Sequence, residues 1–486
     1  MASSCPNADL KQYASSSEIE DRRAYLEPLI ASKARQEEIC VQLPHVDEVV
    51  AVRERLVSLD IFRGLAIALM ILVDDGGGKW PAINHSPWNG VTLADFVMPF
   101  FLFIVGISIS FSYKRIPSKA DATSKAIQRS LKLVVLGIIL QGGYYHGLND
   151  LSFGVDVTRI RWCGILQRIA FAYFVVSICE IWNPRRLGNS PPRGPLDVFN
   201  MYFWHWVVAG LLSTLYLIIL YGVYVPDWEF VPASSQSQSP VKVTCGVRGD
   251  LSPPCNAVGF VDRLLLGLNH MYGAPMYRRT KECSINSPDY GPAPPGAPSW
   301  CQAPFEPEGL LSSVSAAGSC FIGLHYGHIL ILLKSHDTRV KHWMIPSLGL
   351  IIFGITLHYL GMPLNKPIYS FSYVCVTAGT AGLVFVAIYL IADVCGVTWP
   401  TKLLEWMGQN SLIIFVLAAC GVFAGLIQGF YWKEPENNLV NFVEEHVFQA
   451  LFTSERVAKL VFVLSEIILW CLVAGALKVK GIFWKL

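Results

Sequence analysis

The sequence predicts an all-α protein, a polytopic transmembrane helical bundle with about ten spans and a long disulfide-bearing loop outside the cytosol. Hydrophobic residues make up 53% of the 486 positions and charged residues only 15%, whereas soluble domains are roughly 25% charged. Helices and closed barrels alone satisfy the backbone in lipid, and the apolar runs here are continuous, unlike the alternating segments of a barrel. A net charge of +2 without a basic tract interleaved with aromatics argues against a nucleic-acid partner.

The chain divides into a polar tail and a membrane domain. Residues 1–55 are polar and charged, have no early apolar stretch typical of a signal peptide, and are predicted to be a disordered cytosolic tail. Residues 56–486 form the predicted transmembrane domain, whose first span then also serves as the targeting signal.

The individual spans are predicted from apolar runs of about 17–25 residues, the length that crosses a bilayer. The ten runs lie near 57–74, 91–113, 127–146, 162–182, 203–225, 310–333, 343–361, 371–394, 405–430 and 457–477.

Lysine and arginine in the short connections predict the orientation, because cytosolic loops carry an excess of both. One side holds dense clusters, such as those within 114–129 and 185–193, while the other side holds scattered residues such as Lys79 and Lys366. Both termini are therefore predicted to face the cytosol. By parity, the connection at 76–90 faces the opposite side.

The same parity places the long connection, residues 226–309, outside the cytosol. Its four cysteines in an oxidising space predict two disulfides, for which three connectivities are possible. Zinc is the alternative, but the spacings lack the close CxxC pairs of common structural zinc sites. A helix is expected at 259–273, over the bundle. The four cysteines are Cys245, Cys255, Cys283 and Cys301.

The candidate chemistry lies in the connection between the first two spans. His85 stands among carboxylates close in sequence, Asp74, Asp75 and Asp95, and titratable groups at membrane depth are functional candidates by default. An imidazole can deprotonate an amine or hydroxyl, or accept an acyl group itself. The alternative is an interfacial histidine without a chemical role.

The carboxylates have competing interpretations. Asp75 and Asp95 are candidates to orient the imidazole and stabilise its cation, and Asp74 competes with Asp75 for that role. Asp95 can equally be a helix amino-terminal residue favoured by the helix dipole. The run Gly76 to Gly78 permits positive φ and close approach of the backbone to a ligand, although any tight turn would use glycine.

Motifs along the chain resemble the heparan-α-glucosaminide N-acetyltransferase family, the transmembrane acetyltransferases of the lysosomal membrane with their plant and bacterial relatives. The resemblance covers roughly residues 55–486. Compared with the lysosomal enzyme, the chain is expected to lack an amino-terminal lumenal domain and one preceding span, and it has Asp74 in place of an asparagine. The motifs are SLDIFRG (58–64), GGGKW (76–80), HSPWNGVTLADFVMPFFLFIVG (85–106), RWCGILQRIA (161–170), GFVDRLLLG (259–267), EPEGLL (306–311) and IYSFSYV (368–374).

The resemblance implies acetyl-CoA as donor, an amine or hydroxyl of a lumenal glycan or amino sugar as acceptor, and His85 as the catalytic residue. Arg63, with Arg161 or Arg168, is expected to neutralise the CoA phosphates, a task suited to guanidinium geometry. An ion pair between Asp60 and Arg63 is the structural alternative. Further candidates for the CoA site are Gly76, Gly77, Gly78, Lys79, Trp88 and Asn89.

The predicted function is therefore acetyl transfer across the membrane, by a two-step route through acetyl-histidine or directly. No metal is expected, and the family suggests a homodimer. The predicted location is the membrane of the lysosome, the vacuole or another endomembrane, with the plasma membrane also compatible. The alternatives are a multi-pass transporter of a small polar or anionic solute and a lipid- or sterol-binding scaffold.

Overall fold

The computed structural model describes residues 56–113, 116, 118–141, 144–145, 153–154, 157–183, 195–232, 239–397, 399 and 401–484. The chain divides into two units, Met1–Leu56 and Val57–Leu486, and only the second is described below. The expected disordered tail, residues 1–55, lies outside the described residues. The described part is mostly helical, and its strands form four two-stranded sheets.

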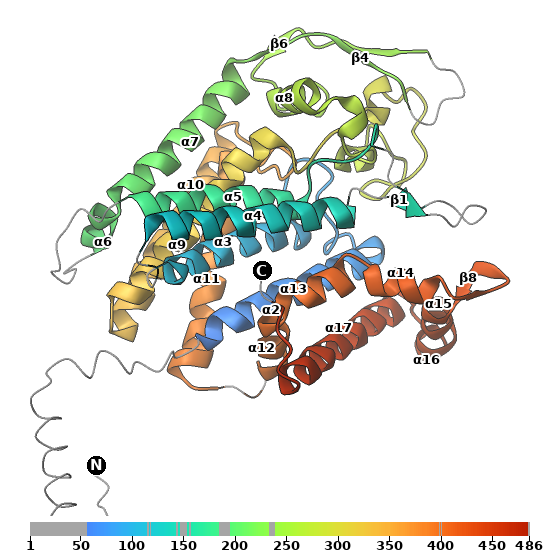
Figure 1. Ribbon diagram of the computed structural model, residues 1–486. Coiled ribbons are helices and arrows are strands. Elements are labelled where there is room, and N and C mark those ends of the chain that lie inside the picture. The colour runs from blue at the N-terminus through green and yellow to red at the C-terminus, as the bar shows by residue number, and fades with distance from the viewer. Residues whose placement is uncertain are drawn as a thin grey trace, which may run out of the picture. The chain divides into compact units, whose positions relative to one another are not determined.

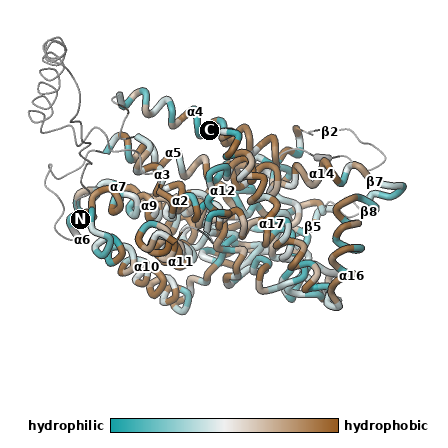
Figure 2. The backbone as a smooth tube through the Cα atoms, turned by 90° about the horizontal axis from the view of Figure 1, so that it is seen from below, coloured by the Kyte–Doolittle hydropathy of each residue, from teal (hydrophilic) through white to brown (hydrophobic). Residues whose placement is uncertain are grey.

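Eight helices in the described part are long and apolar enough to cross a membrane. Figure 2 shows hydrophobic residues running along the long helices, whereas the hairpin of β7 (Tyr431–Trp432) and β8 (Glu434–Asn438) is largely hydrophilic. The predicted helical architecture is confirmed, with eight candidate membrane spans among the described residues. The eight are α3 (Ala94–Ser112), α5 (Ile165–Trp182), α7 (Phe203–Gly222), α9 (Leu310–Leu332), α10 (His336–Tyr359), α11 with the π-helix η6 (Phe371–Val394), the segment Ser411–Gln428 and α17 (Glu455–Val479).

The other two expected spans are helices that carry more charge. The helix α2 (Val57–Gly76) contains Asp60, Arg63, Asp74 and Asp75 within its 20 residues. The helix α4 (Lys119–Gln141) starts earlier than the expected 127–146, because its amino-terminal half is charged and escapes an apolar search. The count of ten spans therefore stays a prediction.

The expected ninth span, 405–430, is not one continuous helix. It consists of α12 (Lys402–Gln409), α13 (Ser411–Ile414), the π-helix η7 (Phe415–Ala419) and α14 (Val422–Gln428). Asn410 departs from helical geometry at φ −114° and ψ 30°, and Gly421 takes the left-handed conformation at φ +67°. An apolar search cannot detect these interruptions, because the residues on both sides of them are apolar. Breaks of this kind commonly occur at π-turns and glycines.

Close helix packing places α3 at the centre of the bundle, against α9, α2, α5 and α11 (Figure 1). A Cβ atom added at Gly106 of α3 would collide with the carbonyl oxygen of Cys320, and one at Gly323 of α9 with that of Phe103. Small residues of this kind let two membrane helices approach at backbone distance. The core of the bundle therefore positions the amino-terminal end of α3, where the candidate site begins.

The long connection forms a small disulfide-bonded layer between α7 and α9. It contains β3 (Tyr224–Val225), β4 (Trp228–Phe230), β5 (Val241–Val243), β6 (Val247–Arg248) and α8 (Ala257–Leu266), shown in green to yellow in Figure 1. The helix expected at 259–273 is confirmed in its first half. It begins after Asn256, whose side chain accepts a hydrogen bond from Gly259 N at 2.7 Å, and ends at Gly267 with φ +84°.

The four cysteines of this connection form two disulfides, as predicted. Cys245 is bonded to Cys255, and Cys283 to Cys301. Of the three possible connectivities, the chain has the one that joins neighbours in sequence. Each disulfide closes a short loop, with sequence separations of 10 and 18 residues.

Candidate active site

The loop between α2 and α3 brings His85 against a buried carboxylate. Asp95, in the first turn of α3, is fully buried, and its Oδ1 lies 2.8 Å from His85 Nδ1. Its Oδ2 accepts hydrogen bonds from Ser86 N at 3.1 Å and from the backbone and hydroxyl of Thr92, both at 3.0 Å. These donors stabilise the ionised carboxylate without competing for the oxygen that faces the imidazole.

A lysine from a distant segment completes this arrangement. Lys366 Nζ lies 2.9 Å from His85 Nδ1, 3.3 Å from His85 Nε2 and 3.8 Å from Asp95 Oδ1. Lys366 belongs to the short connection between α10 and α11, which is tied to the His85 loop by Gly90 N donating to Leu364 O at 2.8 Å and by a hydrogen bond of 3.1 Å between Asn365 Nδ2 and Asn89 Oδ1.

The disulfide-bonded layer covers the other side of the His85 loop. Arg279 donates from Nη2 to the carbonyl oxygen of His85, and Trp88 Nε1 donates to Leu251 O at 3.0 Å. Trp88 also packs edge-on against Phe305 and Tyr277, at centroid distances of 5.4 and 6.0 Å. The loop is thus held from α3, from the α10–α11 connection and from the long connection.

The surroundings favour a neutral imidazole at position 85. Burial lowers the pKa of His85 from its usual value, the charges of Lys366 and Arg279 lower it further, and Asp95 raises it, with a net lowering. The side chain still exposes 21% of its surface, so a substrate atom can reach it. Burial also lowers the pKa of the Lys366 ammonium, against the opposing effect of Asp95.

Of the three candidate carboxylates, the structure places Asp95 beside His85. Asp75, in the last turn of α2, lies within electrostatic reach of Lys459 and Glu444 instead. Asp74 acts on Lys366 from a longer distance. The geometry therefore favours Asp95 as the partner of the imidazole, and Asp95 also lies in the first turn of a helix, as the alternative interpretation expects.

The glycine run does not adopt the expected backbone conformation. Gly77 lies at the start of the short 3₁₀-helix η2 (Gly77–Lys79), and none of Gly76 to Gly78 has a positive φ. The 3₁₀ turn continues the right-handed geometry of α2, so these glycines do not use the positive φ that glycine permits. Gly78 is exposed, and a Cβ atom added there would meet no atom within 4 Å. The close approach of a ligand to this backbone stays a prediction.

Two of the cations proposed for CoA phosphates have partners of their own. Arg63 Nη1 lies 3.1 Å from Asp60 Oδ1, and its Nη2 donates to Ser108 Oγ on α3. Lys79 pairs with Glu455 at 2.6 Å on an exposed surface. Asp60 and Arg63 thus form the ion pair that the sequence offered as the alternative to phosphate binding.

Arg161 and Arg168 both bond to the turn that precedes α9, whereas Arg63 bonds to Asp60 and Ser108. Arg161 Nε donates to Glu306 at 2.9 Å, and its Nη2 lies 2.7 Å from Glu308. Arg168 is 1% exposed and donates to Pro307 O at 2.7 Å, while its Nη1 has no hydrogen-bond partner among the described residues. Such an unpaired, buried donor is costly unless a ligand completes it.

Sequence reasoning counted Lys366 only among the charges of a short loop and gave it no role. Its 281 residues of separation from His85 hide the contact from any local pattern. The available signal was its place directly before the motif at 368–374, one of the segments that carry the family resemblance.

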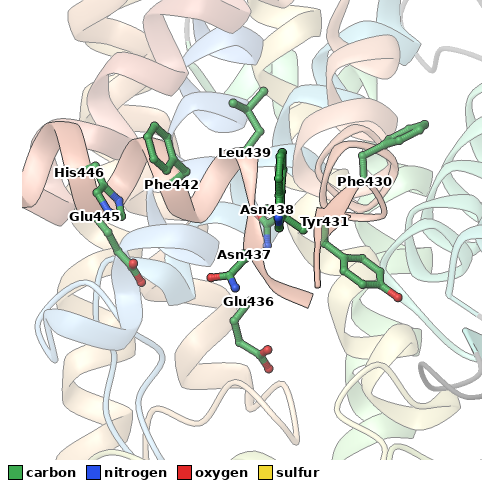
Figure 3. Close-up of a pocket in the computed structure, with 10 residues that line it drawn as sticks. Phe430, Tyr431, Glu436, Asn437, Asn438, Leu439, Phe442, Glu445 and His446 are labelled. Carbon is green, nitrogen blue, oxygen red and sulfur yellow. The ribbon is translucent and has the colours of Figure 1, made fainter. Parts of the chain in front are cut away.

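A separate cavity of about 640 Å³ opens near the β7–β8 hairpin (Figure 3). Its lining residues all come from 430–446 and combine aromatic side chains such as Trp432 with Glu436 and Glu445. It is distinct in sequence from the His85 loop.

Among the described residues, no group of three or more histidine, cysteine, aspartate or glutamate side chains is arranged to hold a metal ion.

Comparison with known proteins identifies relatives of the chain. Residues 55–187, which include His85 and Asp95, match the family model of the catalytic region of heparan-alpha-glucosaminide N-acetyltransferase. The enzyme of that name from Mus musculus is 28% identical over 450 residues, and that from Homo sapiens is 29% identical over 455. These alignments cover 89% and 90% of this chain, which spans 60% of the length of each relative. These matches support the resemblance seen in the sequence: the chain is similar to heparan-alpha-glucosaminide N-acetyltransferases, and its residues 55–187 resemble their catalytic region.

Proposed function

We propose that this chain is a transmembrane acetyltransferase that moves the acetyl group of acetyl-CoA to an amine or hydroxyl of a glycan on the non-cytosolic side. The observation that carries the proposal is a partly exposed imidazole, His85, paired at 2.8 Å with a fully buried carboxylate, Asp95. Both residues lie in the segment that matches the catalytic region of the family. The names of the relatives support acetyl transfer to an amino sugar.

The pairing with Asp95 gives the two ring nitrogens of His85 different tasks. An ionised carboxylate only accepts hydrogen bonds, so Nδ1 of His85 carries the proton and donates it to Asp95 Oδ1. Nε2 then has the lone pair with which the imidazole acts. Asp95 stabilises the positive charge that develops on the ring, as the carboxylate does in other triads.

Two routes of acetyl transfer use the same atom. In the direct route, Nε2 takes the proton of the acceptor while the acceptor attacks the acetyl carbon and the thioester bond breaks. In the two-step route, Nε2 itself attacks the acetyl carbon, the thioester bond breaks and CoA leaves as its thiolate. The acceptor then attacks the acetyl carbon, the bond to Nε2 breaks, and the acceptor proton passes to the released thiolate. Labelled acetyl on His85 in the absence of an acceptor would identify the two-step route.

For the donor, Arg168 is the cation that we expect to contact acetyl-CoA. Its Nη1 is buried without a hydrogen-bond partner among the described residues, while its other nitrogens donate to Pro307 O and to serine hydroxyls. Arg63, Lys79 and Arg161 pair with carboxylates instead. A phosphate or thioester oxygen would satisfy this donor. The roles of Gly76 to Gly78, Trp88 and Asn89 at the donor site remain part of the proposal.

The disulfides support the proposed orientation. The long connection that carries them contacts the His85 loop through Arg279 and Trp88, so both lie on one side of the bundle. Disulfides persist in oxidising compartments, and the proposal therefore places this side in the lumen of a lysosome, a vacuole or another endomembrane, with both termini in the cytosol.

The test is acetyl transfer by the purified protein from labelled acetyl-CoA to oligosaccharides that end in glucosamine with a free amine. His85→Ala should lower kcat/KM by about 10²- to 10⁴-fold, the usual contribution of acid–base catalysis. His446→Ala, at an exposed histidine, is the matched control and should keep full activity. Activity of His85→Ala within a few-fold of the unmodified protein would contradict the proposal, and a solute transporter would transfer no label to any acceptor.

A further inference from the structure

The contact between Lys366 and His85 has no role in the acetyl transfer described so far. The ammonium lies 2.9 and 3.3 Å from the two ring nitrogens, and its side chain is only 14% exposed. Holding a lysine against an imidazole in a buried site is unfavourable without compensation. The arrangement therefore needs an explanation beyond packing.

The charges around the pair come from several elements. His85 is faced by Asp95 of α3, by Lys366 of the α10–α11 connection and by Arg279 of the long connection. Lys366 is faced in addition by Asp74 of α2, Glu308 before α9 and Arg168 of α5. The three carboxylates, Asp74, Asp95 and Glu308, compensate the buried ammonium. They oppose the lowering of its pKa by burial.

The ammonium lies close to both ring nitrogens, 2.9 Å from Nδ1 and 3.3 Å from Nε2. Nδ1 donates its proton to Asp95 Oδ1 at 2.8 Å and cannot accept a second proton. Lys366 therefore acts on the imidazole as a positive charge held against the ring.

We propose that Lys366 is a positioning residue whose charge, held against the ring, keeps His85 neutral before transfer. The inference rests on the proposed function and deepens it. In the direct route the acceptor proton moves to Nε2 as the acceptor bonds to the acetyl carbon. The nearby ammonium then disfavours the imidazolium, so the same proton passes to the CoA thiolate as the carbon–sulfur bond breaks.

The experiment measures the protonation of His85 without any transfer reaction. Diethyl pyrocarbonate modifies neutral imidazole, and mass spectrometry of the peptide that contains His85 gives the extent of reaction at each pH. Lys366→Gln should move the half-maximal pH upward by about one to three units, since removing a neighbouring like charge raises the pKa of an imidazole. Lys366→Arg keeps the charge and should stay close to the unmodified protein.

Two further variants secure the result. Lys366→Met keeps the length of the aliphatic stem and replaces Lys366→Gln if the latter does not purify as a folded protein. Lys242→Gln, an exposed lysine of the long connection that pairs with Asp227, is the matched control and should leave the half-maximal pH unchanged. An unchanged half-maximal pH in both neutral variants would overturn the inference.

The pH dependence of transfer gives the second measurement. In the unmodified protein kcat/KM should fall as the pH drops through the lowered pKa of His85, below the usual 6.5, because only neutral imidazole accepts a proton. In Lys366→Gln this fall should begin at higher pH. A protein without acetyl transfer would refute the proposed function, yet the modification experiment would still decide the role of Lys366.

Discussion

At the scale of single residues, the candidate site depends on a carboxylate, Asp95, one of whose oxygens is held by hydrogen bonds while the other faces the imidazole. Asp95 Oδ2 accepts three hydrogen bonds from Ser86 and Thr92, which leaves Oδ1 for His85. The backbone therefore fixes the carboxylate, and the carboxylate fixes the ring. This order explains how a histidine on a loop can keep one orientation, as a catalytic group requires.

Replacing Asp95 by asparagine tests this dependence. In Asp95→Asn the amide can donate to Nδ1, which moves the ring proton to Nε2 and removes the lone pair from the acting atom. We expect kcat/KM to fall by about 10²- to 10⁴-fold while the protein still purifies as a folded bundle. The measurement is steady-state transfer of labelled acetyl.

The control for this variant is Asp227→Asn, at an exposed carboxylate of the long connection, which should keep full activity. Loss of activity with an unfolded protein would assign Asp95 a purely structural role. Retained activity would show that another carboxylate, such as Asp74, supports His85.

The sequence predicted those residues of the site that lie close together along the chain. His85 and Asp95 stand ten residues apart, and their residue types already indicated acid–base chemistry. The role of Lys366 was not predicted, because its contact with His85 depends on the packing of α10 and α11 against the rest of the bundle. Long-range contacts of this kind follow from the fold and not from any spacing along the chain.

At the scale of secondary-structure elements, the position of Asp95 depends on how closely α3 packs on α9. The contact uses Gly106 of α3 and Gly323 of α9, each of which faces a backbone carbonyl of the other helix. Apolar length predicted both helices, but it gave no sign of which pairs would touch. The interruptions at Asn410 and Gly421 were likewise invisible to a count of apolar residues.

Adding one methyl group at Gly323 should separate these helices. Gly323→Ala places a Cβ against the carbonyl of Phe103, and overpacking of a core typically costs about 1–3 kcal/mol. The melting temperature in detergent should fall. Gly349→Ala, in α10, meets open space and is the matched control, expected to leave the melting temperature unchanged or slightly raised, since alanine favours helix over glycine. Equal melting temperatures for both variants would contradict the proposed close packing.

At the scale of the whole membrane domain, two disulfide loops hold the loop that carries His85. The loop closed by Cys245 and Cys255 contains Leu251, which accepts the hydrogen bond of Trp88. The loop closed by Cys283 and Cys301 contains Pro288, whose carbonyl accepts from Arg279 at 2.8 Å, and Arg279 in turn donates to the carbonyl of His85. The sequence predicted two disulfides, but only the folded chain connects them to the candidate site.

Removing the second disulfide should therefore weaken the site more than the bundle. In the double variant Cys283→Ser and Cys301→Ser, loss of an 18-residue closed loop removes about 3 kcal/mol of stabilisation from the long connection. Pro288 then no longer fixes Arg279, and the carbonyl of His85 loses its donor in part of the population. We expect a several-fold lower kcat, with helix content by circular dichroism unchanged, because the long helices lie outside the loop that this disulfide closes. Arg279→Gln should give a similar loss of kcat with both disulfides intact. A double variant that keeps full kcat while Arg279→Gln loses activity would mean that the disulfide does not hold Arg279 in place.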